Sequence, residues 1–144
     1  MSYYADSSFL VSCHLLDANT RRAKVWLSRT GVSLPFTALH GLEVRNAFNL
    51  GVFRNLFTSA DGAAAWRNVQ SDLRSGRLVR TMIKWPVAFR FAARFSEHHS
   101  ATVGTRSLDL LHVAAAKTLR AVEFVSFDAR QRTAAAAVGL RVAP

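Results

Sequence analysis

Short apolar segments alternate with amphipathic ones along the whole chain, and this alternation limits the possible folds more than any other feature. The clearest strand is 122–127, which is rich in β-branched and aromatic residues. Further strands are expected at 2–5, 32–36, 78–83 and 140–142, and helices at 7–16, 20–28, 39–57, 59–73, 108–120 and 129–138, with another beginning at Trp85. This order predicts an α/β fold in which helices cover both faces of an open sheet.

The chain has the length and composition of one globular domain, expected to span residues 1–144. A chain of this length buries roughly 68% of the surface of its unfolded state, so it needs no disulfide to support a core. Its single cysteine excludes an internal disulfide and fits a reducing compartment. No segment resembles a secretory signal or a membrane span of ~18 apolar residues. We therefore expect a cytoplasmic protein with no membrane partner.

The charge is strongly positive and concentrated in the middle of the chain. There are 19 Lys and Arg against 9 Asp and Glu, which gives a net charge of +10. Nine of the bases fall between residues 44 and 105: Arg45, Arg54, Arg67, Arg74, Arg77, Arg80, Lys84, Arg90 and Arg94. Because the guanidinium fork matches phosphate oxygens, this excess favours a nucleic-acid partner. The alternative is a solvated basic surface that aids solubility.

Two carboxylates directly follow predicted strands. Asp6 follows the strand at 2–5, and Asp128 follows the strand at 122–127. Ligands of open α/β sheets bind beyond the carboxyl ends of the strands, so both positions favour a site. Each Asp is also suited to cap the helix that follows it, which is the structural alternative.

Two further carboxylates lie on predicted helices at positions where burial is costly. The expected core stripe of the helix at 39–57 comprises Leu39, Leu42, Asn46, Leu50, Phe53 and Phe57. Glu43 lies beside this stripe, where a carboxylate needs a cation or several donors, and an ion pair with Arg is the alternative. Asp109 lies in the first turn of its helix, where the helix dipole alone favours an acid. Because Leu108, Leu111 and Ala115 should face the sheet, we also expect Asp109 near the strand ends.

Four carboxylates gathered in one pocket would repel each other unless a cation lay between them. A hard divalent ion with oxygen ligands removes that repulsion, and the lack of clustered His or Cys favours Mg²⁺ or Mn²⁺ over Zn²⁺. An acidic metal pocket in a basic protein suits phosphodiester cleavage, because Arg binds the backbone while the metal activates water. The pattern therefore predicts a metal-dependent nuclease.

Other polar and aromatic residues are interpreted as structural. His112 follows Asp109 by three positions but is surrounded by apolar residues, so we expect a packed histidine. Cys13 has no nearby His in sequence and is expected to be an inert, buried thiol. The aromatic residues around Trp66 and Phe91 could stack on bases, but their helical spacing favours a core or an interface.

The residues around the four acids resemble the motifs of the PIN domain family. They are Tyr4-Ala5-Asp6-Ser7-Ser8, Leu42-Glu43-Val44-Arg45-Asn46-Ala47, Arg106-Ser107-Leu108-Asp109-Leu110-Leu111-His112-Val113-Ala114-Ala115-Ala116 and Phe124-Val125-Ser126-Phe127-Asp128. Together they cover nearly the whole chain. Among compact members of the family, the chain is most similar to VapC-type toxins of toxin/antitoxin pairs.

The resemblance implies a Mg²⁺- or Mn²⁺-dependent endoribonuclease with a three-layer α/β/α sandwich and a mostly parallel central sheet. It places Asp6, Glu43, Asp109 and Asp128 in the acidic quartet. Ser7 and Ser126 would orient water or ligands just outside the metal. Metal-activated water would cleave RNA to leave a 5′-phosphate and a 3′-hydroxyl. The resemblance also implies a homodimer and a small antitoxin protein as partner.

Two readings of the residues compete with the nuclease. In the first, the protein is a noncatalytic basic module that binds nucleic acid, and its acids are helix caps and ion pairs. In the second, it is a receiver-type phosphorylation switch on a similar sheet. The second fits poorly, because such a switch needs paired acids at the end of the first strand, where Asp6 stands alone.

Overall fold

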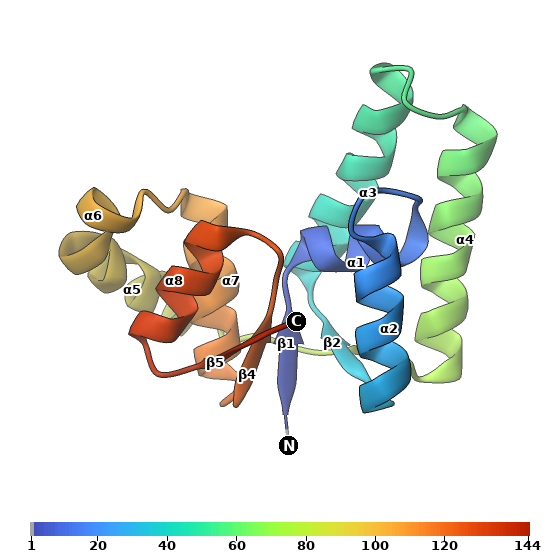
Figure 1. Cartoon of the computed structure of the whole chain (residues 1–144). Helices are drawn as coiled ribbons and strands as arrows, with labels where there is room; N and C mark the ends of the chain where they lie inside the picture. Colours follow the sequence, from blue (N-terminus) through green and yellow to red (C-terminus); the bar gives the residue numbers. More distant parts are fainter. Residues whose placement is uncertain (1) are drawn as a thin grey trace. The chain divides into compact units, whose positions relative to one another are not determined.

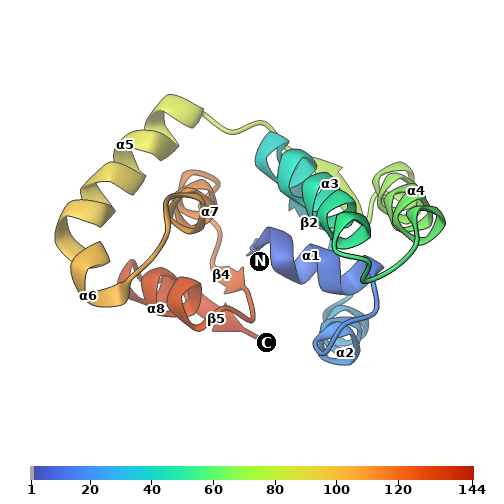
Figure 2. The ribbon, with the colours of Figure 1, turned by 90° about the horizontal axis from the view of Figure 1, so that it is seen from above.

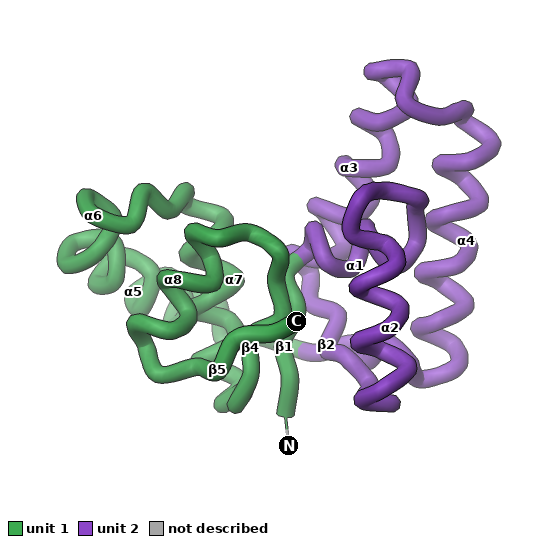
Figure 3. The backbone as a smooth tube through the Cα atoms, in the orientation of Figure 1, with its two compact units in different colours: residues 1–6, 82–144 green, residues 7–81 purple. Residues whose placement is uncertain are grey.

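The computed structural model describes residues 2–144, so Met1, the first residue of the expected domain, lies outside the described part. The described chain forms two compact units (Figure 3). Unit 1 comprises residues 2–6 and 82–144, and unit 2 comprises residues 7–81. The chain passes from unit 1 into unit 2 at the peptide bond after Asp6 and returns after Thr81.

Unit 1 is built on a three-stranded parallel sheet of β1 (Tyr3–Ala5), β4 (Glu123–Val125) and β5 (Arg141–Ala143), in the order β1-β4-β5 (Figure 1). Tyr4 lies opposite Phe124 in the register of β1 and β4, and the two rings stack with centroids 6.0 Å apart. Both side chains are fully buried. This pair forms the centre of the core of unit 1.

Helices α7 and α8 connect the helical part of unit 1 to this sheet. The helical elements of the unit are α5 (Trp85–Phe95), the π-helical turn η1 (Ser96–Ser100), α6 (Ala101–Val103), α7 (Ser107–Thr118) and α8 (Ala129–Ala137). Every residue of α7 from Asp109 to Ala116 is buried, and α5 packs against this helix (Figure 2). The Tyr4 hydroxyl lies 2.9 Å from His112 Nδ1, which links α7 to β1. His112 is therefore a packed histidine, as the sequence indicates.

Unit 2 consists of a two-stranded parallel sheet and four helices. Strand β2 (Leu34–Phe36) pairs with β3 (Leu78–Arg80). The helices are α1 (Ser7–His14), α2 (Thr20–Thr30), α3 (Ala38–Phe53) and α4 (Ser59–Ser75). The two long helices α3 and α4 pack side by side (Figures 1 and 2). The fully buried side chains at the centre of this unit are Phe9, Leu10, Leu34, His40, Val44 and Val69.

The predicted mixture of helices and parallel strands is confirmed. All five predicted strands form, and every strand pair is parallel. Their hydrogen bonds define two sheets, of three and two strands. The expected three-layer sandwich stays a prediction. No helix within residues 2–144 combines the length and the apolar character that a membrane span requires.

The predicted core stripes of two helices are partly wrong. In α3 the buried residues are Leu39, His40, Val44, Phe48 and Gly51, whereas Leu42 is 67% exposed and Phe53 is 81% exposed. Helices α1 and α4 both pack against α3, and the residues of α3 that become buried include Val44 and Phe48 rather than the predicted stripe. In α7, Leu108 is also exposed, because only the residues after it lie against neighbouring elements.

Candidate functional site

Asp6 lies at the carboxyl end of β1, beside the carboxyl end of β4. Its backbone N–H donates to the Val125 carbonyl at 3.0 Å, which continues the parallel ladder by one bond. Its side chain is fully buried, and the Ser126 hydroxyl donates to Asp6 Oδ2 at 2.9 Å. Removing a carboxylate from water is costly unless donors or a cation surround it. The sheet thus holds a desolvated carboxylate at the place where α/β folds bind ligands.

Asp128 lies two residues beyond Ser126 and begins α8. Its Oδ1 accepts the backbone N–H groups of Arg130 at 2.8 Å and Gln131 at 3.0 Å, so it is the N-cap of the helix. Its own N–H donates to Ser126 Oγ at 3.0 Å. The capping role considered from the sequence is therefore real for Asp128. It leaves Oδ2 facing the partly exposed Arg130 guanidinium at 3.9 Å.

Asp109 lies in the first turn of α7 and is 6% exposed. Its Oδ2 accepts the backbone N–H of Arg106 at 3.2 Å and the Nε–H of the same residue at 3.1 Å. Its Oδ1 accepts Nε2–H of Gln131 at 3.1 Å. Gln131 is a residue that sequence reasoning missed. Its position three residues after Asp128 was the available signal, because residues at i and i+3 share one side of a helix.

Hydrogen bonds connect the three acids of unit 1 into one network. Ser126 joins Asp6 to the backbone of Asp128, and Gln131 joins Asp128 to Asp109. Across residues 2–144, no three His, Cys, Asp or Glu side chains lie close enough together to hold a metal ion as they stand. The acids are thus linked through Ser126 and Gln131 rather than facing a common point.

The fourth predicted acid, Glu43, lies on α3 in unit 2 and is half-buried. Ser7 Oγ donates to Glu43 Oε2 at 2.7 Å. Ser7 is itself buried at the start of α1 and directly follows Asp6 in the sequence. Ser7 thus contacts one of the predicted acids, and its expected role of orienting water or ligands just outside a metal stays a prediction.

The donor chemistry of the unit 1 network fits a hard divalent cation. The hydrogen bonds of this network join carboxylates, a hydroxyl and an amide, all of which offer oxygen ligands. Oxygen ligands suit Mg²⁺ and Mn²⁺. One of these oxygens, Oε1 of Gln131, is buried without a hydrogen-bond partner among the described residues. The carboxylates of Asp6, Asp109 and Asp128 therefore have the ligand chemistry that such an ion prefers, although among residues 2–144 no three acids converge on one point.

The nine bases between residues 44 and 105 are all exposed. Arg45 lies over the Trp66 ring, 4.1 Å from its centroid, so that ring is covered by a cation within the protein. Arg77 pairs with Asp72, and it is the one base of the nine that forms an ion pair within residues 2–144. The remaining bases present their charge to solvent, as binding of a polyanion requires.

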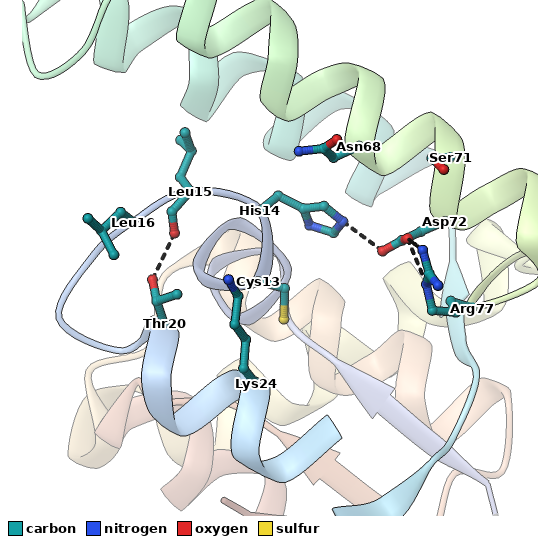
Figure 4. A pocket seen from close by; sticks show the side chains of 10 residues that line it. All are labelled: Cys13, His14, Leu15, Leu16, Thr20, Lys24, Asn68, Ser71, Asp72 and Arg77. Atoms are coloured by element: carbon teal, nitrogen blue, oxygen red, sulfur yellow. Dashed lines mark hydrogen bonds and ion pairs between the residues drawn. The ribbon is translucent and has the colours of Figure 1, made fainter. Parts of the chain in front are cut away.

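A separate pocket of about 310 Å³ lies within unit 2 (Figure 4). Its polar groups already bond to each other. The two nitrogens of the His14 ring face the Leu10 carbonyl at 2.7 Å and Asp72 Oδ2 at 3.0 Å, and Arg77 Nε donates to Asp72 Oδ1 at 2.8 Å. None of the four predicted acids lines this pocket. We interpret it as a structural set of polar contacts that joins α1 to α4.

Cys13 lines the same pocket, where it is half-buried. Burial, with a smaller contribution from the carboxylates of Asp72 and Asp17, raises the pKa of Cys13 from 9.0 to about 12. Because the thiolate is the reactive form, we expect iodoacetamide at pH 8 to label Cys13 at least about tenfold more slowly in the folded protein than in urea. The thiol has a lower pKa in the unfolded chain than in the folded protein, so it ionises in the unfolded chain at lower pH. The folded state should therefore lose stability as the pH rises from 9 towards 12. Equal labelling rates in both states would contradict this prediction, and Cys13→Ser is the unlabelled control.

Comparison with known proteins gives a structural match and no sequence match. No protein-family model matches the chain, and no curated protein matches it by sequence. The fold is similar to that in the crystal structure of FitAcB from Neisseria gonorrhoeae, with a TM-score of 0.62. The match covers 99% of this chain and 96% of that chain at 17% sequence identity. At this identity the similarity establishes a shared fold.

Proposed function

We propose that the chain is a Mg²⁺- or Mn²⁺-dependent endoribonuclease and the toxin of a toxin/antitoxin pair. The observation that carries the proposal is the hydrogen-bonded network of Asp6, Ser126, Asp128, Gln131 and Asp109 at the carboxyl ends of neighbouring parallel strands. These acids are the ones that the resemblance to PIN domains assigns to the metal. The shared fold with FitAcB supports the proposal at the level of architecture.

Each residue of the network has a definite task in this proposal. The Ser126 hydroxyl holds one oxygen of Asp6, and the first N–H groups of α8 hold one oxygen of Asp128. These bonds fix the two carboxylates in orientation, so that little reorganisation is needed when substrate binds. A divalent ion bound by the acids would activate water and neutralise the charge of the leaving oxygen. The exposed Arg side chains would bind the RNA backbone through its phosphates.

Glu43 is proposed as the fourth acid of the site. Its carboxylate accepts the Ser7 hydroxyl at 2.7 Å, which fixes its orientation within unit 2. In the proposal its role as an acid of the quartet rests on the resemblance to PIN domains. The proposed partners other than RNA are a second copy of the chain and a small antitoxin protein. Leu42 and Phe53 on α3 are exposed apolar side chains that support a protein partner.

The direct test replaces Asp128 by Asn, because this change separates charge from capping. Asn caps helices about as well as Asp, so α8 and the stability of the fold should be kept within about 0.5 kcal/mol. The negative charge that the ion needs is lost. We expect cleavage of a labelled RNA in Mg²⁺ or Mn²⁺ to fall at least about tenfold, while the thermal midpoint changes little.

The matched control is Asp61→Asn on α4. Asp61 is an exposed capping residue that exchanges hydrogen bonds with Thr58 and belongs to no part of the network. Its replacement should leave cleavage unchanged. Undiminished cleavage by Asp128→Asn, or an equal loss in the control, would refute the proposed role of Asp128.

A noncatalytic nucleic-acid-binding module is the second candidate, and one observation favours it. The structure uses Asp128 as a helix cap and pairs Asp109 with Arg106, which are the roles that this alternative assigns to acids. Titration with Mn²⁺ separates the two functions. The nuclease should bind Mn²⁺ in the micromolar to millimolar range, whereas a noncatalytic module should bind RNA without any Mn²⁺ site.

A further inference from the structure

Gln131 carries an unsatisfied buried oxygen inside the acidic network. The residue is 5% exposed, and its Oε1 has no hydrogen-bond partner among the described residues. A buried polar atom left without a partner costs roughly 1–3 kcal/mol, so native proteins keep few of them. The unpaired oxygen therefore needs an explanation, and the acids that surround Gln131 in the network suggest one.

The orientation of the Gln131 amide follows from its neighbour. Nε2 lies 3.1 Å from Asp109 Oδ1, where a donor is required. If the amide were turned over, two oxygen atoms would face each other at that distance, and the other oxygen of Asp109 already accepts the Arg106 Nε–H. The oxygen is thus the atom left over, and it belongs to the side chain that bridges Asp109 and the helix capped by Asp128.

We propose that Gln131 Oε1 is a ligand group for the divalent ion of the acidic network, either in direct contact or through one water. This inference rests on the proposed function and adds a neutral oxygen to its carboxylates. Amide oxygens are ordinary ligands of hard cations, and a cation would satisfy the atom that the protein leaves unpaired. Gln131 also positions Asp109 through Nε2. Its amide would therefore have two roles, with Oε1 as a ligand of the ion and Nε2 as a donor that orients Asp109.

Two substitutions distinguish a ligand from a residue that only positions Asp109. Both Gln131→Met and Gln131→Glu remove the Nε2 donor to Asp109. Only Gln131→Glu keeps a side-chain oxygen, and that oxygen is charged. A purely positioning role predicts that both variants bind Mn²⁺ more weakly at high salt, where the charge added by Gln131→Glu is screened unless it contacts the ion. A ligand role predicts that Gln131→Met is weakened and Gln131→Glu is not.

The experiment measures the Kd of Mn²⁺ by calorimetry at high salt for the full chain and its variants in the absence of RNA. We expect Gln131→Met to bind about tenfold more weakly than the unaltered protein and Gln131→Glu to bind at least as tightly. The control is Gln70→Met, the same change at an exposed position of α4, which should leave the Kd unchanged. Far-UV circular dichroism and thermal melts without metal check that each variant folds.

Each outcome bears on the inference. An unchanged Kd in Gln131→Met, or weaker binding in both variants, would overturn it. If Gln131→Met does not fold, the rise in thermal midpoint on adding Mn²⁺ decides: a larger rise in Gln131→Glu than in the unaltered protein supports it, and any other result overturns it. Failure of the unaltered protein to bind millimolar Mn²⁺ would overturn this inference and the metal-dependent function together. Mn²⁺ binding without RNA cleavage would refute the nuclease alone.

Discussion

Replacing Asp6 by Asn is expected to abolish RNA cleavage while the protein stays folded. Asp6 is the most deeply buried acid of the network, with no exposed surface. Asn has nearly the same size, and its side-chain oxygen can still accept the Ser126 hydroxyl that now bonds to Asp6 Oδ2. What the substitution removes is the negative charge in a desolvated position, where it interacts most strongly with a cation.

The expected loss in cleavage is at least about a hundredfold. Replacing a residue that merely supports a metal ligand already costs about 10- to 100-fold in metal affinity or activity, and Asp6 is proposed as a ligand itself. The measurement is the rate of cleavage of a labelled RNA at saturating Mg²⁺ or Mn²⁺, with Mn²⁺ calorimetry in parallel. We expect the calorimetric signal to weaken together with the cleavage rate.

Thermal melts complete the test of Asp6→Asn. A midpoint within a few degrees of the unaltered protein shows that lost cleavage reflects lost charge rather than unfolding. Asp61→Asn, which removes an exposed carboxylate from α4, should keep both its cleavage rate and its Mn²⁺ affinity. Undiminished cleavage by Asp6→Asn would remove Asp6 from the proposed site, and loss of RNA cleavage without weaker Mn²⁺ binding would show that it acts on substrate instead.

Phe124→Ala should lower the free energy of unfolding by about 3–5 kcal/mol. Phe124 is fully buried on β4, the central strand of its sheet, and stacks on Tyr4 of β1. Truncation removes the ring from the core and leaves a cavity that two paired strands cannot fill by moving. Because domains are stable by only about 5–15 kcal/mol, such a loss approaches complete unfolding.

Urea titration followed by circular dichroism measures this effect as a lower midpoint at unchanged slope. The matched control is Phe53→Ala at the end of α3. That ring is 81% exposed, so its removal should cost no more than about 0.5 kcal/mol. Similar costs at the two positions would show that Phe124 is not at the centre of the core.

The sequence was sufficient for the elements but not for every helix face. Strand β4 and its neighbours are recognisable because short runs of β-branched and aromatic residues stand between turn residues. The buried face of α3 was misjudged because Leu42 and Phe53 are apolar yet exposed. A periodic pattern shows that a helix has an apolar face, whereas the elements that pack on it decide which face is buried.

The residues of the candidate site, too, could be predicted only in part from the sequence. Asp6 and Asp128 were recognisable because each follows a predicted strand, and their neighbour Ser126 was expected to support them. Gln131 was not singled out, because a glutamine in the first turn of a helix is usually a solvated residue. Its burial and its bond to Asp109 depend on how α7 and α8 pack together, which no local pattern records.

The sequence by itself determined the order of helices and strands, the basic surface and the positions of the acids, because these properties depend on residue type and local spacing. Only the tertiary structure decided that Ser126 and Gln131 link three of those acids, and that Gln131 Oε1 is left without a partner among the described residues. Hydrogen bonds need their atoms within about 3 Å of each other. Residues that are more than a hundred positions apart, such as Asp6 and Ser126, reach that distance only when the strands that carry them pair.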